Sequence, residues 1–126
     1  MSFRSDARAT ALEIRQTLDT AFRLAARTNG FVTVEPEPRR GKGRIAPLIP
    51  KTLAWGKPAR VPLPPRTLDA RWAEAPKTFT LTPWHTATEG MWFLHAGSRA
   101  LCVRISAKGE VKVLRFRPLL RRWTEV

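Results

Sequence analysis

Basic residues gather at one place where they could neutralise phosphate groups. Within six consecutive positions, two glycines separate four cations, which are Arg39, Arg40, Lys42 and Arg44. Glycine lets a backbone follow a groove closely, and short basic arms bind grooves of DNA or RNA because phosphates attract them from both sides. The cluster therefore predicts nucleic-acid contact. The alternative is a solvated basic loop with no particular partner.

A second basic patch is predicted towards the C-terminus. Its members are Arg99, Arg104, Lys112, Arg115, Arg117, Arg121 and Arg122. Arg115 and Arg117 are two residues apart, so on a regular strand they point the same way. Together with Arg104 on a neighbouring strand, we expect them to form one cationic face that binds phosphates bidentately.

Aromatic residues give a weaker signal for the same function. Trp92 and Trp123 could stack on unpaired bases. However, five tryptophans and six phenylalanines in a chain of this size are more typical of core packing.

Catalytic and metal-binding patterns are poorly supported. His85, Glu89 and His95 can be read as a ligand set, but their segment does not resemble a long helix and no second carboxylate or cysteine completes a closed site. Cys102 falls inside a predicted strand, where thiols are usually buried and inert. We therefore predict no catalytic residues, no bound metal or cofactor, and no small-molecule substrate.

The charge balance is the main feature of the composition. The 126 residues include 23 Lys and Arg against 10 Asp and Glu, a formal net charge of +13. An excess of this size predicts a polyanionic partner or an acidic protein surface. The length predicts a single small domain, no segment is apolar enough to span a membrane, and one cysteine without an apolar leader predicts a cytoplasmic protein.

Residues 5–29 are predicted to form an amphipathic helix, capped by Ser5 and ended by Asn29-Gly30. One stripe at helical spacing contains Ala7, Ala11, Ile14, Leu18, Ala21, Phe22, Leu24 and Ala25. Four arginines flank this stripe and form either a solvated face or a phosphate-facing ridge; they are Arg4, Arg8, Arg15 and Arg23.

Residues 35–66 are predicted to form a proline-rich, basic, extended arm. The segment holds eight basic and two acidic residues, and its prolines disfavour regular elements. Its recurring apolar residues argue against a free linker, so we expect it to dock on its own domain or on a partner. Residues 67–75 then fit a short helix capped by Thr67.

Residues 78–126 are predicted to form an antiparallel β-meander with a basic C-terminal tail. Phe79 lies in a first alternating stretch, and strands follow at 91–96, 99–106 and 110–117. The apolar phase shifts along 110–117, which predicts either a strand buried on both faces or a bulge near Val113-Leu114. Residues 119–123 are expected to form a helical turn or a tail.

These elements predict an α+β fold, in which one N-terminal amphipathic helix packs on a small antiparallel β-meander and the arm lies between them. The favoured function is non-enzymatic nucleic-acid binding, alone or as a basic subunit of a nucleoprotein complex, through phosphate contacts with weak sequence preference. The sequence does not distinguish DNA from RNA as the ligand, and it does not indicate an oligomeric state.

The alternative function is an adaptor or inhibitor that docks on an acidic or nucleic-acid-binding surface of a protein partner. An apolar row in the arm favours it, because phosphate-binding arms seldom need one; the row is Ile45, Leu48, Ile49, Leu53 and Trp55. An enzyme that uses His85, Glu89 and His95 ranks below both.

Overall fold

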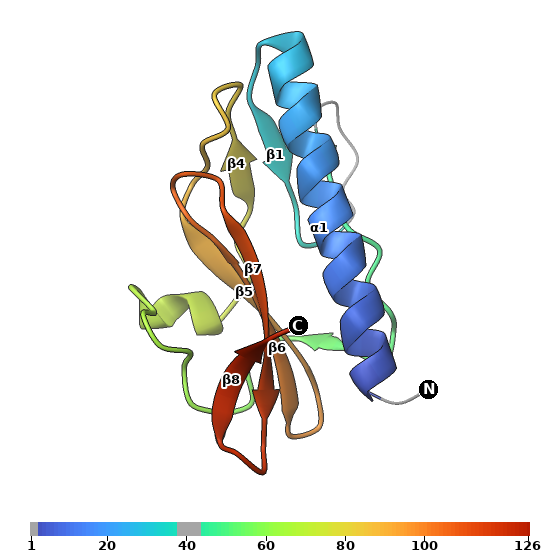
Figure 1. Cartoon of the computed structure of the whole chain (residues 1–126), viewed down its shortest axis with the longest axis vertical. Coiled ribbons are helices and arrows are strands. Elements are labelled where there is room, and N and C mark those ends of the chain that lie inside the picture. The colour runs from blue at the N-terminus through green and yellow to red at the C-terminus, as the bar shows by residue number, and fades with distance from the viewer. Residues whose placement is uncertain (1–2, 38–43) are drawn as a thin grey trace.

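The computed structural model describes residues 3–37 and 44–126, and Figure 1 shows one long helix beside two small sheets. The helix α1 runs over Phe3–Thr28 and a short 3-10 helix η1 over Ala70–Ala73. The strands are β1 (Val32–Val34), β2 (Arg44–Ile45), β3 (Ala54–Trp55), β4 (Phe79–Leu81), β5 (Gly90–Ala96), β6 (Arg99–Ile105), β7 (Val111–Arg117) and β8 (Arg122–Glu125).

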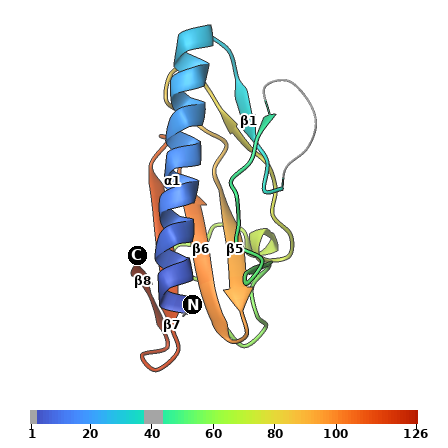
Figure 2. The same cartoon turned by 90° about the vertical axis from the view of Figure 1, so that its right-hand side faces the viewer.

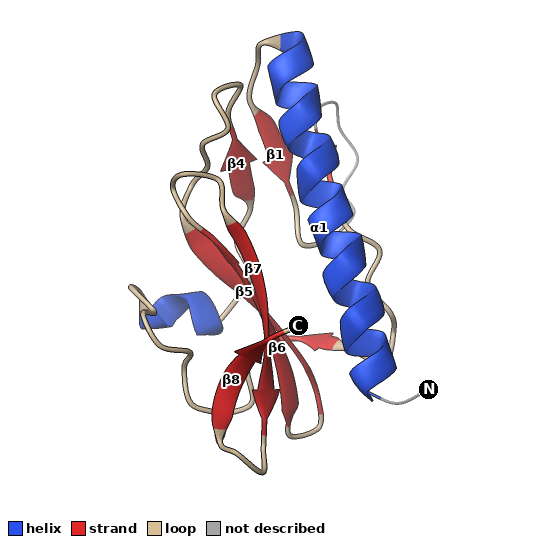
Figure 3. Ribbon diagram, in the orientation of Figure 1, coloured by secondary structure: helices blue, strands red, loops and turns tan. Residues whose placement is uncertain are grey.

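The strands form two sheets, of order β2-β1-β4 and β3-β5-β6-β7-β8 (Figure 3). All pairs are antiparallel except β1 with β2. The predicted α+β class, with one N-terminal helix packed on antiparallel strands, is confirmed.

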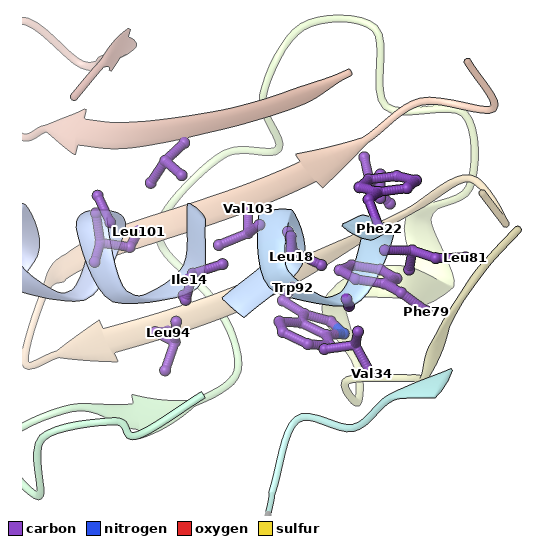
Figure 4. Packing of buried hydrophobic residues seen from close by; sticks show 14 of the residues in the cluster. Ile14, Leu18, Phe22, Val34, Phe79, Leu81, Trp92, Leu94, Leu101 and Val103 are labelled. Atoms are coloured by element: carbon purple, nitrogen blue, oxygen red, sulfur yellow. The ribbon is translucent and has the colours of Figure 1, made fainter. Parts of the chain in front are cut away.

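The apolar stripe of α1 faces the sheets as its spacing predicts. Ile14, Leu18 and Phe22 are buried; Ile14 and Leu18 lie near Leu101 and Val103 of β6, whereas Phe22 lies towards Phe79 and Leu81 of β4 (Figure 4). The helix begins at Phe3, so the expected cap at Ser5 is wrong. Its end is as predicted, because Asn29 is left-handed (φ 51°) and the amide of Gly30 donates to the carbonyl of Ala25 at 3.1 Å.

The three meander strands are confirmed as β5, β6 and β7. The two-residue turn between β5 and β6 uses Gly97 at φ 62°, a conformation that favours glycine. The register of β6 with β7 is regular and pairs Val103 with Val113 and Cys102 with Leu114. Of the two alternatives for β7, burial on both faces is therefore correct and the bulge is not.

The C-terminal segment differs from its prediction. The expected helical turn or tail is wrong, because Arg122–Glu125 pairs with β7 as strand β8. This pairing lets Trp123 pack against Phe116 and Phe93 on the sheet face away from α1, and its indole N–H donates to the carbonyl of Pro62 at 2.9 Å. Burial of this aromatic surface explains why the chain continues the ladder after Pro118.

The segment between the helix and the meander contacts the domain at several points. Ile45 pairs with Val34, Trp55 pairs with Leu94, and Leu53 and Val61 are buried. Residues 38–43 lie outside the described residues, so the arm over 35–66 as a whole stays a prediction.

The short helix predicted over 67–75 is present only as η1. Its cap is Asp69 rather than Thr67, because the Asp69 carboxylate accepts from the backbone amide of Arg71 at 2.9 Å. Hydrogen bonds from the Arg71 side chain and backbone hold the pKa of Asp69 at about 2.

The helix–sheet contact predicts a clear stability difference between two leucines of α1. Leu18→Ala should lower the free energy of unfolding by about 2–5 kcal/mol, because the buried side chain leaves a cavity between α1 and the five-stranded sheet. Leu12→Ala is the matched control: Leu12 is 58% exposed, so its loss should change stability by less than about 0.5 kcal/mol. Urea denaturation measures both. Equal effects would contradict the packing described.

Candidate nucleic-acid interface

The register of β7 divides the predicted C-terminal basic patch into two parts. Arg104 pairs with Lys112, and both lie on the sheet face away from α1. Arg115 pairs with Leu101 and, like Arg117, lies on the face that α1 packs against. The expected single face joining Arg104 to Arg115 and Arg117 is therefore wrong, because alternate residues of a strand point to opposite faces.

Five arginines gather instead at one end of the five-stranded sheet, where the β5–β6 and β7–β8 turns lie together at the bottom of Figure 1. We call this group the hairpin-end arginine cluster; it consists of Arg99, Arg115, Arg117, Arg121 and Arg122. A groove of about 570 Å³ runs between the two turns and is lined by residues that include Ser98, Arg99, Arg117 and Leu119. Three arginines of the cluster, Arg99, Arg115 and Arg117, therefore line a concave surface.

Uncompensated charge is the main electrostatic property of the β7–β8 turn, which holds three arginines of this cluster. Arg117 and Arg122 are direct partners across the β7–β8 ladder, and like charges in such positions repel. Arg117, Arg121 and Arg122 are exposed, and in the part of the chain that the structure describes no carboxylate lies within 4.0 Å of their guanidinium groups. A bound polyanion would relieve this repulsion.

Two leucines stand at the tip of the β7–β8 turn. Leu119 is 99% exposed and Leu120 is 54% exposed, next to Arg117 and Arg121. Neither leucine was predicted to belong to a site. The signal was available in the apolar pair that follows Pro118 directly between basic residues.

One flank of α1 extends the positive surface. The guanidinium group of Arg15 donates to the carbonyl of Val111 at 3.2 Å, which fixes this flank towards β7. Arg8 is exposed and lies two helical turns earlier on the same side. Figure 2 shows β7 beside the N-terminal half of α1, in agreement with the contacts between these two elements. Arg23 does not contribute equally, because it pairs with Asp19 at 3.1 Å.

The first predicted basic cluster contributes little to the described geometry. Arg39, Arg40 and Lys42 lie outside the described residues. The backbone of Arg44 is placed in β2, where it pairs with Thr33 of β1. Its contact with nucleic acid stays a prediction.

Both tryptophans considered for base stacking are used in packing. Trp92 is fully buried, stacks on Phe79 with ring centroids 4.2 Å apart, and donates its indole N–H to the carbonyl of Lys77. Trp123 is half-buried with its ring 5.5 Å from Phe116. The prediction that packing outweighs stacking is confirmed for Trp92.

The residues considered for catalysis lie in different surroundings. His85 stacks on Phe22 at 4.1 Å, whereas Nδ1 of His95 is 2.9 Å from the carbonyl oxygen of Gly56. Within residues 3–37 and 44–126, no group of three or more acidic, histidine or cysteine side chains could hold a metal ion. Cys102 is buried as predicted, and burial raises the pKa of its thiol to about 12.

Comparison of the chain with protein-family models, with curated proteins and with solved structures found no match. Among the described residues, no helix is both long and apolar enough to cross a lipid bilayer.

The burial of Cys102 predicts a slow thiol reaction. At pH 8, native protein should react with a disulfide reagent far more slowly than urea-unfolded protein, because the buried thiol is protonated and the reagent cannot reach it. Absorbance of the released thiolate follows both reactions. A native rate close to the unfolded rate would contradict the burial of Cys102 in β6.

Proposed function

We propose that this protein binds nucleic acid without catalysing a reaction, through phosphate contacts at the hairpin-end arginine cluster. The observation that carries the proposal is the exposed Arg117–Arg122 pair, which has no carboxylate partner among the described residues. Guanidinium groups bind phosphate oxygens bidentately, and phosphate contacts supply most of the affinity of non-specific binding. We therefore expect weak sequence preference and a steep dependence on salt.

The shape of the β7–β8 hairpin supports the same proposal. The pairing of β7 with β6 ends at Arg115, so only the end of the β7–β8 hairpin could approach a groove, where Arg117 and Arg122 on its two arms would reach phosphates. The exposed Leu119 at the tip would contact base edges or sugars. A role as the basic subunit of a nucleoprotein complex, in the cytoplasm, is compatible with one buried unpaired cysteine.

Removal of three charges at the cluster tests the proposal. The variant Arg117→Ala, Arg121→Ala, Arg122→Ala should reduce the slope of log K against log salt by about 2–3, because each lost phosphate contact releases about one counterion fewer. Fluorescence anisotropy with mixed-sequence duplex and single-stranded DNA and RNA, between about 50 and 200 mM salt, measures the slope.

A matched control removes the same charge elsewhere. Lys51, Arg60 and Lys108 are exposed and lie outside the hairpin-end arginine cluster, so their joint replacement by Ala should leave most of the slope intact. An equal loss in both variants would show that total charge, and not this cluster, binds the nucleic acid. No binding by the wild type at about 50 mM salt would overturn the proposal.

The exposed leucines favour one second candidate, an adaptor that docks on an acidic protein surface. An apolar tip within a ring of arginines resembles the centre of a protein interface, where apolar anchors carry most of the affinity. If the protein is such an adaptor, the double variant Leu119→Ser, Leu120→Ser should no longer capture one stoichiometric acidic protein in a pull-down. The slope of log K against log salt for nucleic-acid binding should stay unchanged. Loss of nucleic-acid binding instead would favour the first proposal.

A further inference from the structure

A second hollow lies on the sheet face away from α1, apart from the hairpin-end arginine cluster. It has a volume of about 300 Å³, between η1 with its preceding loop and strands β6 and β7. This is the lower end of the range that small-molecule sites occupy. The hollow therefore suits a small-molecule ligand.

Opposite charges line this hollow without pairing across it. Arg66, Arg104 and Lys112 line it together with Glu89 and Glu110. None of the ion pairs among the described residues joins these two carboxylates to these three cations. The one pair that involves the hollow is Lys112 with Glu125, at a long 3.9 Å.

Arg104 is held in an electrostatically costly position at the floor of the hollow. Its Nη2 donates to the carbonyl of Pro65 at 2.6 Å, whereas its Nε is buried without a hydrogen-bond partner. It also lies directly opposite Lys112 in the β6–β7 ladder. A buried unpaired donor and a like-charge neighbour both destabilise the protein, and an anion in the hollow would offset the repulsion between Arg104 and Lys112.

The remaining wall is apolar. Trp72 and Leu68 line the hollow, and Leu68 is 69% exposed. Trp72 is half-buried against the cluster of Met91, Phe93 and Cys102, which fixes its ring in place. At the rim, Arg66 has the left-handed φ of 64°, a conformation uncommon outside glycine that often marks a functional position.

We infer that this hollow binds a small zwitterion with an apolar body, namely a free aromatic or large aliphatic α-amino acid. The ligand carboxylate would bind Arg104 and Lys112, its ammonium group would bind Glu89 and Glu110, and its side chain would lie against Trp72 and Leu68. Three cations and two carboxylates leave one net positive charge, which favours a carboxylate over a phosphate dianion. The site does not depend on nucleic-acid binding.

Three related probes separate the parts of this site. L-Phenylalanine carries both charges, 3-phenylpropionate lacks the ammonium group, and 2-phenylethylamine lacks the carboxylate. Isothermal calorimetry should give the lowest Kd for L-phenylalanine and a Kd at least about tenfold higher for each of the other two, because each loses a charge-assisted contact. Adenosine monophosphate tests whether the hollow binds a nucleotide in place of an amino acid.

Variants of the hollow test the assignment of the residues. Arg104→Met should abolish binding of L-phenylalanine in a protein that circular dichroism shows to be folded, although the variant also loses the hydrogen bond to the carbonyl of Pro65. Lys112→Met is a second variant, should Arg104→Met fail to fold. The control Lys108→Met, at an exposed position of the β6–β7 turn, should change neither binding nor stability.

Several results would overturn the inference. They are the absence of saturable binding of L-phenylalanine up to about 10 mM, equal binding of 2-phenylethylamine, or tighter binding of adenosine monophosphate. The variant Arg117→Ala, Arg121→Ala, Arg122→Ala should still bind L-phenylalanine. Loss of nucleic-acid binding in that variant would thus leave this second site intact, and the two proposals fail separately.

Discussion

The packing of α1 on the central strands is the contact on which the rest of the structure depends. Ile14, Leu18 and Phe22 cover one face of β5, β6 and β7 and also reach β1 and β4, so one helix joins two sheets. The opposite face of the five-stranded sheet is closed by Trp123 of β8 and by the segment that holds Val61 and Trp72. With both faces of its middle covered, this sheet has room for exposed cations mainly at its ends and edges.

That constraint explains where the basic residues lie. In the middle of β7, Val113 and Leu114 are apolar on opposite faces, whereas Arg117 extends past the end of the helix contact and is exposed. Arg104 lies near the opposite end of β6, where its Nη2 donates to the carbonyl of Pro65 and its Nε is buried without a partner. Position along the strand, more than residue type, thus separates the hairpin-end arginine cluster from the hollow beneath η1.

Much of the fold was predictable because local patterns specified it. The helical spacing of Ile14 and Leu18, and the alternation of Leu101 and Val103, each identify one buried face. Strand β8 was not predictable in this way, because it is stabilised by the contact of Trp123 with Phe116 and by the carbonyl of Pro62, 61 residues away. The candidate nucleic-acid interface was likewise predictable only in part. Its basic residues could be identified from the sequence, but the sheet face that each one occupies depends on the register of β6 with β7. The hollow could not be derived from spacing, because its lining residues come from segments far apart in the sequence.

The contact between α1 and β7 also has a consequence for the order of folding. Arg15 reaches the carbonyl of Val111 across 96 positions of the chain, while β5, β6 and β7 are joined by turns of two and five residues. Closing a long loop costs more entropy than closing a hairpin, and contacts between distant residues slow folding. We therefore expect the β5–β6–β7 hairpins to form early and the helix to dock late. Until it docks, the apolar face of the hairpins is exposed, so the kinetic barrier and the risk of aggregation both arise at this one step.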